Sequence, residues 1–292
     1  MASWLAGLAF AFAGLTSARS VLAIDLDPLW DFSKPELSEQ RFRSALTSAT
    51  GDDALILQSQ IARTYGLRGD FTKAREILDA LEPRIPAAGA EARARHALEL
   101  GRTYASAAHP PPSQTAQAKE RARAAYLHAL EIAKSGQLDG LAVDALHMLA
   151  FVDTEPADQL KWAQEALAVA DASSQPAAKK WQASLRNNLG YALHQLGRFD
   201  EALAQFKQAV VLRERGKDPE ATRAAHWMVA WTLRALHRTD DALAIQLRLE
   251  RECEAAGAPD PYVFEELELL YREKGDEARA GRYAQRRKAL AK

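Results

Sequence analysis

The side chains that most often carry chemistry are thinly spread along this chain. Its seven histidines and single cysteine are the first candidates for metal binding or nucleophilic catalysis. No two histidines lie at metal-binding spacing on one helix, and a single cysteine excludes an intramolecular disulfide and a multi-cysteine metal site. Cys253 falls late in a helical segment, where a structural residue is far more typical than a nucleophile. We therefore expect no metal and no cofactor.

Catalytic and nucleic-acid-binding patterns are also missing from the sequence. There is no nucleophile elbow with a serine, histidine and aspartate order, and no glycine-rich loop of the phosphate-binding kind. The basic run 282–288 is typical of a helix C-terminus that offsets the helix dipole. The formal net charge is −1, from 38 basic and 39 acidic residues, and gives no general attraction to nucleic acid or an anionic membrane. The sequence predicts a non-enzymatic protein that does not bind nucleic acid.

The composition favours helix throughout. Hydrophobic residues make up 48% of the chain, which is enough for a packed core. Alanine is frequent, valine and isoleucine are sparse, and no long stretch alternates in polarity as a strand does. These features predict an all-α protein.

The N-terminus allows two interpretations. Residues 4–15 form an apolar run of about 12 residues, which suits a signal peptide core and is too short to span a bilayer. Val21-Leu22-Ala23 fits a cleavage site, but no basic residue precedes the run and Arg19 follows it. Residues 1–23 are thus a signal peptide of a periplasmic or secreted protein, or an N-terminal extension of a cytoplasmic one. No transmembrane span is expected.

A helical hairpin with small residues at its contact points recurs along the chain. In Ala183–Leu212, Leu189-Gly190 marks a first helix, Gly197-Arg198-Phe199 forms a turn, and a second helix follows with Ala202, Phe206 and Ala209 on one face. Five further segments repeat this pattern more or less closely. The reference residues of the first helices are Ala62, Gly101, Ala150, Gly190, Ala230 and Glu268.

The spacing of these reference residues defines the repeat. The steps between them are 39, 49, 40, 40 and 38 residues, and the long step contains a proline-rich insertion, 109–113. Hairpins of this kind bury a core only by stacking on their neighbours. Glu268 stands in the last repeat where the others have alanine or glycine, and we expect it to face water, because a terminal repeat has one uncovered side.

This pattern resembles the tetratricopeptide repeat family over about residues 55–290, and its period resembles the long-repeat branch that includes kinesin light chain and bacterial helical peptide receptors. The resemblance implies an all-α, right-handed α-solenoid of about six stacked helix-turn-helix repeats with one extra N-terminal helix. It divides the chain into residues 1–23, a lead-in segment with the N-terminal helix at 24–53, and the repeat array at 54–290.

The resemblance also implies where a ligand would bind. In this family the first helices line a concave surface, and positions about one turn apart face the ligand. Guanidinium groups there would recognise carboxylates, and aromatic rings would give rigid apolar anchors. The implied partner is a protein or peptide with acidic and hydrophobic elements. The implied binding residues are Arg63, Arg95, Arg102, His147, Phe151, Asn187, Tyr191, His194, Trp227, Trp231 and Arg234.

Other interpretations of these residues stay open. Trp227 and Trp231 could form an apolar stripe in the core between repeats, and Arg63 and Arg102 could be solvated or paired with Glu99. The family's lysine and asparagine carboxylate clamp is not reproduced. We expect a non-catalytic scaffold that binds a protein or peptide in its concave groove, or alternatively a regulator whose solenoid changes pitch when a peptide binds.

Overall fold

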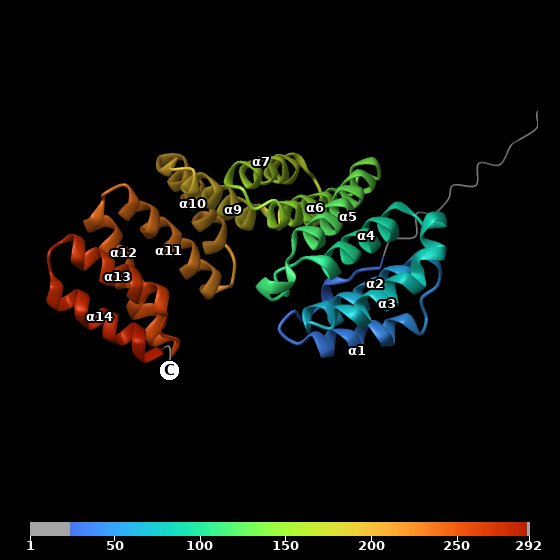
Figure 1. Ribbon diagram of the computed structural model, residues 1–292, viewed down its shortest axis with the longest axis horizontal. Helices are drawn as coiled ribbons and strands as arrows, with labels where there is room; N and C mark the ends of the chain where they lie inside the picture. Colours follow the sequence, from blue (N-terminus) through green and yellow to red (C-terminus); the bar gives the residue numbers. More distant parts are fainter. Residues whose placement is uncertain (1–23, 291–292) are drawn as a thin grey trace, which may run out of the picture.

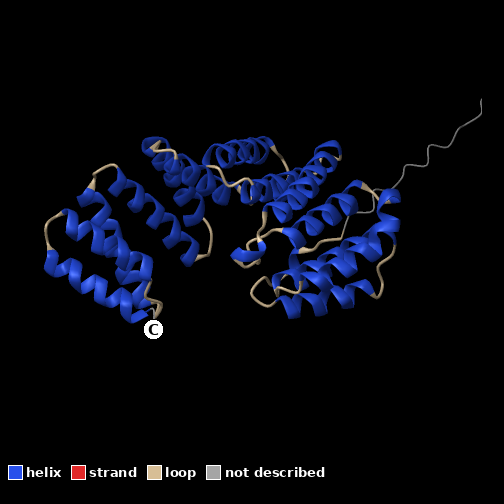
Figure 2. Ribbon diagram, in the orientation of Figure 1, coloured by secondary structure: helices blue, strands red, loops and turns tan. Residues whose placement is uncertain are grey.

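The structure, a computed structural model, describes residues 24–290, and the possible signal peptide at 1–23 lies outside them. The described part contains helices and no strand (Figure 2). Its α-helices are α1 (Pro35–Leu46), α2 (Gly51–Leu67), α3 (Phe71–Leu81), α4 (Ala90–Tyr104), α5 (Ala116–Ser135), α6 (Asp139–Val152), α7 (Pro156–Ala172), α8 (Pro176–Lys179), α9 (Gln182–Gln195), α10 (Phe199–Glu214), α11 (Pro219–Ala235), α12 (Thr239–Ala255), α13 (Pro261–Glu273) and α14 (Glu277–Leu290).

The helices after α1 form stacked antiparallel pairs. The pairs are α2/α3, α4/α5, α6/α7, α9/α10, α11/α12 and α13/α14, and α8 is a short link between the third and fourth. They follow one another in an arc, with α6 and α9 on the inner side of α7 and α10 (Figure 1). The predicted α-solenoid with one extra N-terminal helix is confirmed. The proposed boundary at residues 53 and 54 stays a prediction.

Two of the reference residues, Gly101 and Gly190, lie where paired helices come close together. A Cβ atom on Gly190 would stand 2.7 Å from the ring of Phe206, which is completely buried on α10. Gly101 meets the ring of Tyr126 on α5 in the same way. The small residue of the first helix therefore makes room for the aromatic ring of the second, as the hairpin pattern predicted. Between the two helices, Gly197 adopts a positive φ of 72° that other residues rarely tolerate.

The last repeat differs from our expectation. Glu268 does not face water: it is only 5% exposed and lies between Arg272 and Arg287, at 2.8 and 3.2 Å. The sequence prediction was wrong because α14 carries arginines that reach back over α13. Arg286 likewise pairs with Glu250 and Glu254 of α12. The basic run 282–288 thus fastens α14 to the array as well as ending a helix.

Two irregular segments pack onto the array. In the proline-rich insertion, His109 is buried and stacks on Phe71 of α3 with ring centroids 3.6 Å apart. The lead-in segment lies against α1 and α2, where Leu26 joins a core cluster with Phe42. The indole N–H of Trp30 donates to Gln60 of α2 at 3.2 Å. Part of α2 is therefore covered by the chain itself.

Candidate functional site

A buried ion network joins the first three repeats. Arg102 of α4 donates to Glu99 at 2.7 Å and to Asp144 of α6 at 2.5 Å, and Arg63 of α2 lies 3.5 Å from Glu99. The Glu99 side chain is only 3% exposed and that of Arg102 12%. Among residues 24–290, Glu99 Oε2 and Arg63 Nε find no hydrogen-bond partner. Of the two interpretations of these arginines, pairing with Glu99 is the one observed.

The charges in this network hold one another ionised. Burial acts to raise the pKa of Asp144, but the positive charges of Arg102 and Arg63 outweigh it and hold this pKa below its usual range. Burial and the neighbouring Arg102 lower the pKa of Arg63, whereas for Arg102 the nearby Asp144 and Glu99 outweigh burial and raise the pKa. The guanidinium of Arg63 also lies 5.4 Å from the ring of Trp30. These two arginines are committed to contacts within the fold.

The remaining two arginines of the predicted site are paired as well. Arg95 forms an ion pair with Glu91, one turn earlier on α4, at 2.8 Å. Arg234 of α11 makes a forked pair with Glu266 of α13, with both hydrogen bonds at 2.8 Å. All four arginines of the predicted site thus have a partner within the fold, and their binding role stays a prediction.

The aromatic and amide residues of the predicted site come together further along the arc. His147 and Phe151 of α6 and Asn187 and Tyr191 of α9 line one cavity of about 340 Å³, with α7 as its third wall. His147 is held in place by a 3.1 Å hydrogen bond to Asn188. Four residues that the register of the repeats placed on the concave face thus share one hollow.

A continuous row of aromatic rings runs from α9 through α11 to α13. We call Tyr191, Trp231, Trp227 and Tyr262 the aromatic row. The centroids of successive rings are 6.1, 5.8 and 6.3 Å apart. The two tryptophans are half-buried, whereas the outer members Tyr191 and Tyr262 are 43% and 64% exposed. His194 stacks on Trp231 with centroids 3.4 Å apart and thickens the row at its centre. The centre of the row is therefore packed into the fold, and its two ends are exposed to solvent.

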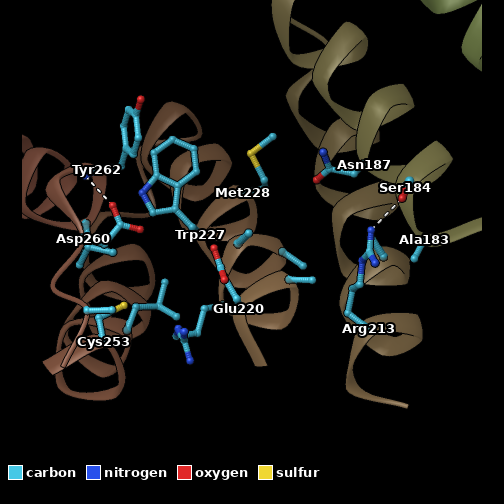
Figure 3. Close-up of a pocket in the computed structure, with 18 of the residues that line it drawn as sticks. Ala183, Ser184, Asn187, Arg213, Glu220, Trp227, Met228, Cys253, Asp260 and Tyr262 are labelled. Atoms are coloured by element: carbon cyan, nitrogen blue, oxygen red, sulfur yellow. Dashed lines mark hydrogen bonds between the residues drawn. The ribbon is translucent and has the colours of Figure 1, made fainter. Parts of the chain in front are cut away.

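A larger cavity lies beside the aromatic row. It measures about 740 Å³ and extends over the N-terminal half of α11, where alanines leave space between α9, α10 and α13. Figure 3 shows Trp227 and Tyr262 on one side of it and Asn187 and Arg213 on the other. Asn187 lines both cavities, so the two hollows adjoin at α9. Together they make a groove across the inner side of α6, α9, α11 and α13.

Several residues of this groove were not predicted. Tyr262 lies six residues before Glu268, in the register that Ser184 holds before Gly190, and extending the repeat register to that position would have found it. Arg213 belongs to a second helix, and Cys253 comes from α12. No rule confined to the concave positions of first helices could have included those two residues.

His194 makes the stability of the site depend on pH. Burial, together with the positive charge of Arg234, lowers the pKa of this histidine to about 4, from an ordinary value near 6.5. As the pH falls from about 6.5 towards 4, the unfolded chain therefore takes up the proton before the folded chain does. Because of His194, the free energy of unfolding is expected to fall as the pH drops through this window. Above about pH 6.5 this histidine should have no effect on it.

Between pH 7 and pH 5, we expect the free energy of unfolding to fall by about 1–2 kcal/mol more in the wild type than in His194→Phe. Phenylalanine keeps the stacking on Trp231 but cannot be protonated. Urea unfolding at both pH values measures this difference. All other ionisable groups are the same in the two proteins, so the comparison isolates His194. An equal loss in the two proteins would contradict the assignment.

Between residues 24 and 290, no group of three or more His, Cys, Asp or Glu side chains is arranged to hold a metal ion. No helix in this part of the chain is both long and apolar enough to cross a membrane.

Comparison with known proteins identifies the class of the chain. Residues 181–250, which include α9, α10, α11 and most of α12, match the family model for the tetratricopeptide repeat. This segment therefore matches the tetratricopeptide repeat, and the helix pairs on either side of it stack in the same way, which supports a tetratricopeptide repeat protein. No curated protein matches the chain. The family is generally a non-catalytic interaction fold, and membership suggests a protein or peptide as the partner.

Solved structures share the fold at low sequence identity. One is a signal transduction ATPase with numerous domains and a tetratricopeptide repeat sensor, from Pyrococcus horikoshii, which is 14% identical with a TM-score of 0.67 over 88% of this chain. The match spans only 39% of that ATPase. Two structures of a Podosopora anserina protein, provisionally assigned as a kinesin light chain with nearly identical TPR-like repeats, are 15% and 17% identical. Their TM-scores are 0.55 and 0.53, over 72% of this chain and 100% and 99% of theirs.

Proposed function

We propose that the groove across α6, α9, α11 and α13 binds an extended segment of a partner protein and leaves it chemically unchanged. The observation that carries this proposal is the aromatic row with two adjoining cavities beside it. Tyrosine and tryptophan give large contact area at a small cost in side-chain entropy, and they are frequent among residues that dominate binding energy. Contacts of this kind hold a segment without reacting with it, which is the role of a scaffold.

The position of the groove supports this proposal. The lead-in segment already covers part of α2, and Arg63, Arg95 and Arg102 are paired within the fold. The exposed rings Tyr191 and Tyr262 stand instead at the two ends of the aromatic row. A segment lying along the row would span α9, α11 and α13, and side chains of the segment could enter the cavities.

Removing an exposed end of the row is expected to weaken binding without unfolding the protein. A random 12-residue peptide library displayed on phage is selected on the wild-type protein, and the enriched peptides are then synthesised. We expect Tyr191→Ala and Tyr262→Ala each to weaken binding of those peptides by about tenfold or more, which is about 1.4 kcal/mol. Fluorescence anisotropy measures the affinity, and melting temperatures should stay close to wild type.

Val211→Ser is the matched control, because Val211 is an exposed apolar residue of α10 outside the groove. It should leave binding unchanged. Equal binding by wild-type and both tyrosine variants would exclude the groove. Failure of the library to yield any peptide above background would contradict peptide binding itself.

A ligand-responsive regulator is the second candidate function. The observation in its favour is that α9, α11 and α13 touch one another little, while the larger cavity lies across α11 between them. A peptide bridging these helices could draw them together and change the pitch of the solenoid. Small-angle scattering with and without a selected peptide tests this, and an unchanged profile at saturation would count against it.

A further inference from the structure

The larger cavity contains two guanidinium groups that lack the partners found by other arginines of the inner surface. Arg213 of α10 and Arg223 of α11 both line it and are both half-buried. Within residues 24–290, neither has a carboxylate within 4.0 Å. The guanidinium of Arg213 makes one hydrogen bond, to the hydroxyl of Ser184 at 2.8 Å, out of the five N–H donors it possesses (Figure 3).

The two carboxylates of the cavity each lie at the N-terminus of a helix. Asp260 accepts the backbone N–H of Tyr262 at 2.8 Å and caps the start of α13. Glu220 lies in the first turn of α11, where the helix dipole favours negative charge. Both carboxylates thus have a stabilising partner in a helix N-terminus. Arg213 is likewise favoured by the C-terminal end of α10, but in the described part of the chain neither it nor Arg223 is paired with a carboxylate, so both keep N–H donors that can bind one.

The rest of the wall is mainly apolar. Trp227 and Met228 of α11, Leu249 of α12 and Val263 of α13 line the same space. A guanidinium on such a wall binds a carboxylate more strongly than one in open water, because less of the attraction is screened. The same wall favours a neighbouring apolar side chain.

We infer that this cavity receives an acidic side chain of the bound peptide, an aspartate or glutamate next to a large apolar residue, and that Arg213 and Arg223 hold its carboxylate. The inference rests on the proposed function and names the peptide class that the groove selects. It adds a second place for acid recognition to the one predicted at Arg63, Arg95 and Arg102, which are paired with Glu99, Glu91 and Asp144.

Cys253 provides a reporter for this cavity. It is the only cysteine in the chain and it lines the cavity wall. Burial raises the pKa of its thiol, with Arg223 acting in the opposite direction, so alkylation by iodoacetamide is best followed under mildly alkaline conditions. A peptide that fills the cavity should slow this reaction.

The test uses hexapeptides acetylated at the N-terminus and amidated at the C-terminus, in pools with one defined position, so that every carboxylate belongs to a side chain. We expect pools with aspartate or glutamate beside leucine, phenylalanine or tryptophan to bind best and to slow alkylation of Cys253 about fivefold or more. In Arg213→Gln and Arg223→Gln, acidic pools should lose about tenfold in affinity, while their neutral counterparts bind unchanged.

Arg215→Gln is the matched control, because Arg215 is exposed just beyond the end of α10 and does not line the cavity. It should keep the acid preference. The inference would be overturned if peptide pools bound without a preference for acidic residues, or if both glutamine variants kept that preference. Either result would leave the proposed function standing. Octanoate is the second probe: protection of Cys253 equal to that by the best peptide would overturn the assignment to a peptide side chain. Binding by no pool would contradict the proposed function itself.

Discussion

Replacing Arg102 with methionine is expected to lower the free energy of unfolding by about 3 kcal/mol or more at pH 7. Methionine preserves much of the side-chain volume but removes the guanidinium that binds both Glu99 and Asp144. Two carboxylates that are almost fully buried would then share only Arg63, which lies 3.5 Å from Glu99. Urea unfolding measured by circular dichroism checks the value.

The same variant should respond to pH in a characteristic way. In the wild type, the low pKa of Asp144 contributes stability that is present above the unfolded pKa near 4 and is lost as the pH falls further. Without Arg102 the pKa of the buried Asp144 is expected to rise, because burial then dominates. The deficit of the variant relative to wild type should therefore shrink between pH 7 and pH 5.

Arg95→Met is the control for this prediction. Arg95 lies on the same helix, but it pairs only with Glu91, one turn away, and its side chain is 22% exposed. Loss of such a pair costs at most about 1 kcal/mol. If Arg102→Met were as mild as Arg95→Met, the network would be incidental to stability.

Interactions within one helical hairpin could be predicted from the sequence. The contact between Gly190 and Phe206 lies within one hairpin, so the repeating pattern of small and aromatic residues was enough to predict the fold. The same register predicted Tyr191 and Trp231 on the inner surface, and in the structure their ring centroids are 6.1 Å apart.

The partners of the arginines could not be predicted in this way. Arg102 and Asp144 are 42 residues apart, and Arg234 and Glu266 are 32 apart. Which charges meet between successive repeats depends on the stagger of helices that sequence spacing alone does not fix. Arg213 was missed for a different reason: it reaches the groove from a second helix.

Gly190→Ala is expected to destabilise the protein by about 1–3 kcal/mol, although alanine is the better helix former by about 1 kcal/mol. The new methyl group would stand 2.7–2.9 Å from three ring atoms of Phe206, which is fully buried and cannot swing into solvent. The helices α9 and α10 would have to move apart. Because every hairpin depends on stacking against its neighbours, the effect should extend to the adjoining repeats.

The control reverses the sign of the effect. Gly281 is also inside a helix, α14, but a Cβ atom there would meet nothing within 4 Å. Gly281→Ala should therefore gain up to about 1 kcal/mol from helix propensity alone. Adding Phe206→Leu to Gly190→Ala tests the cause, because the smaller side chain relieves the contact. The two substitutions should then cost less together than the sum of their separate costs in urea unfolding. Additive costs would mean that Gly190 and Phe206 are not the pair that sets the distance between α9 and α10.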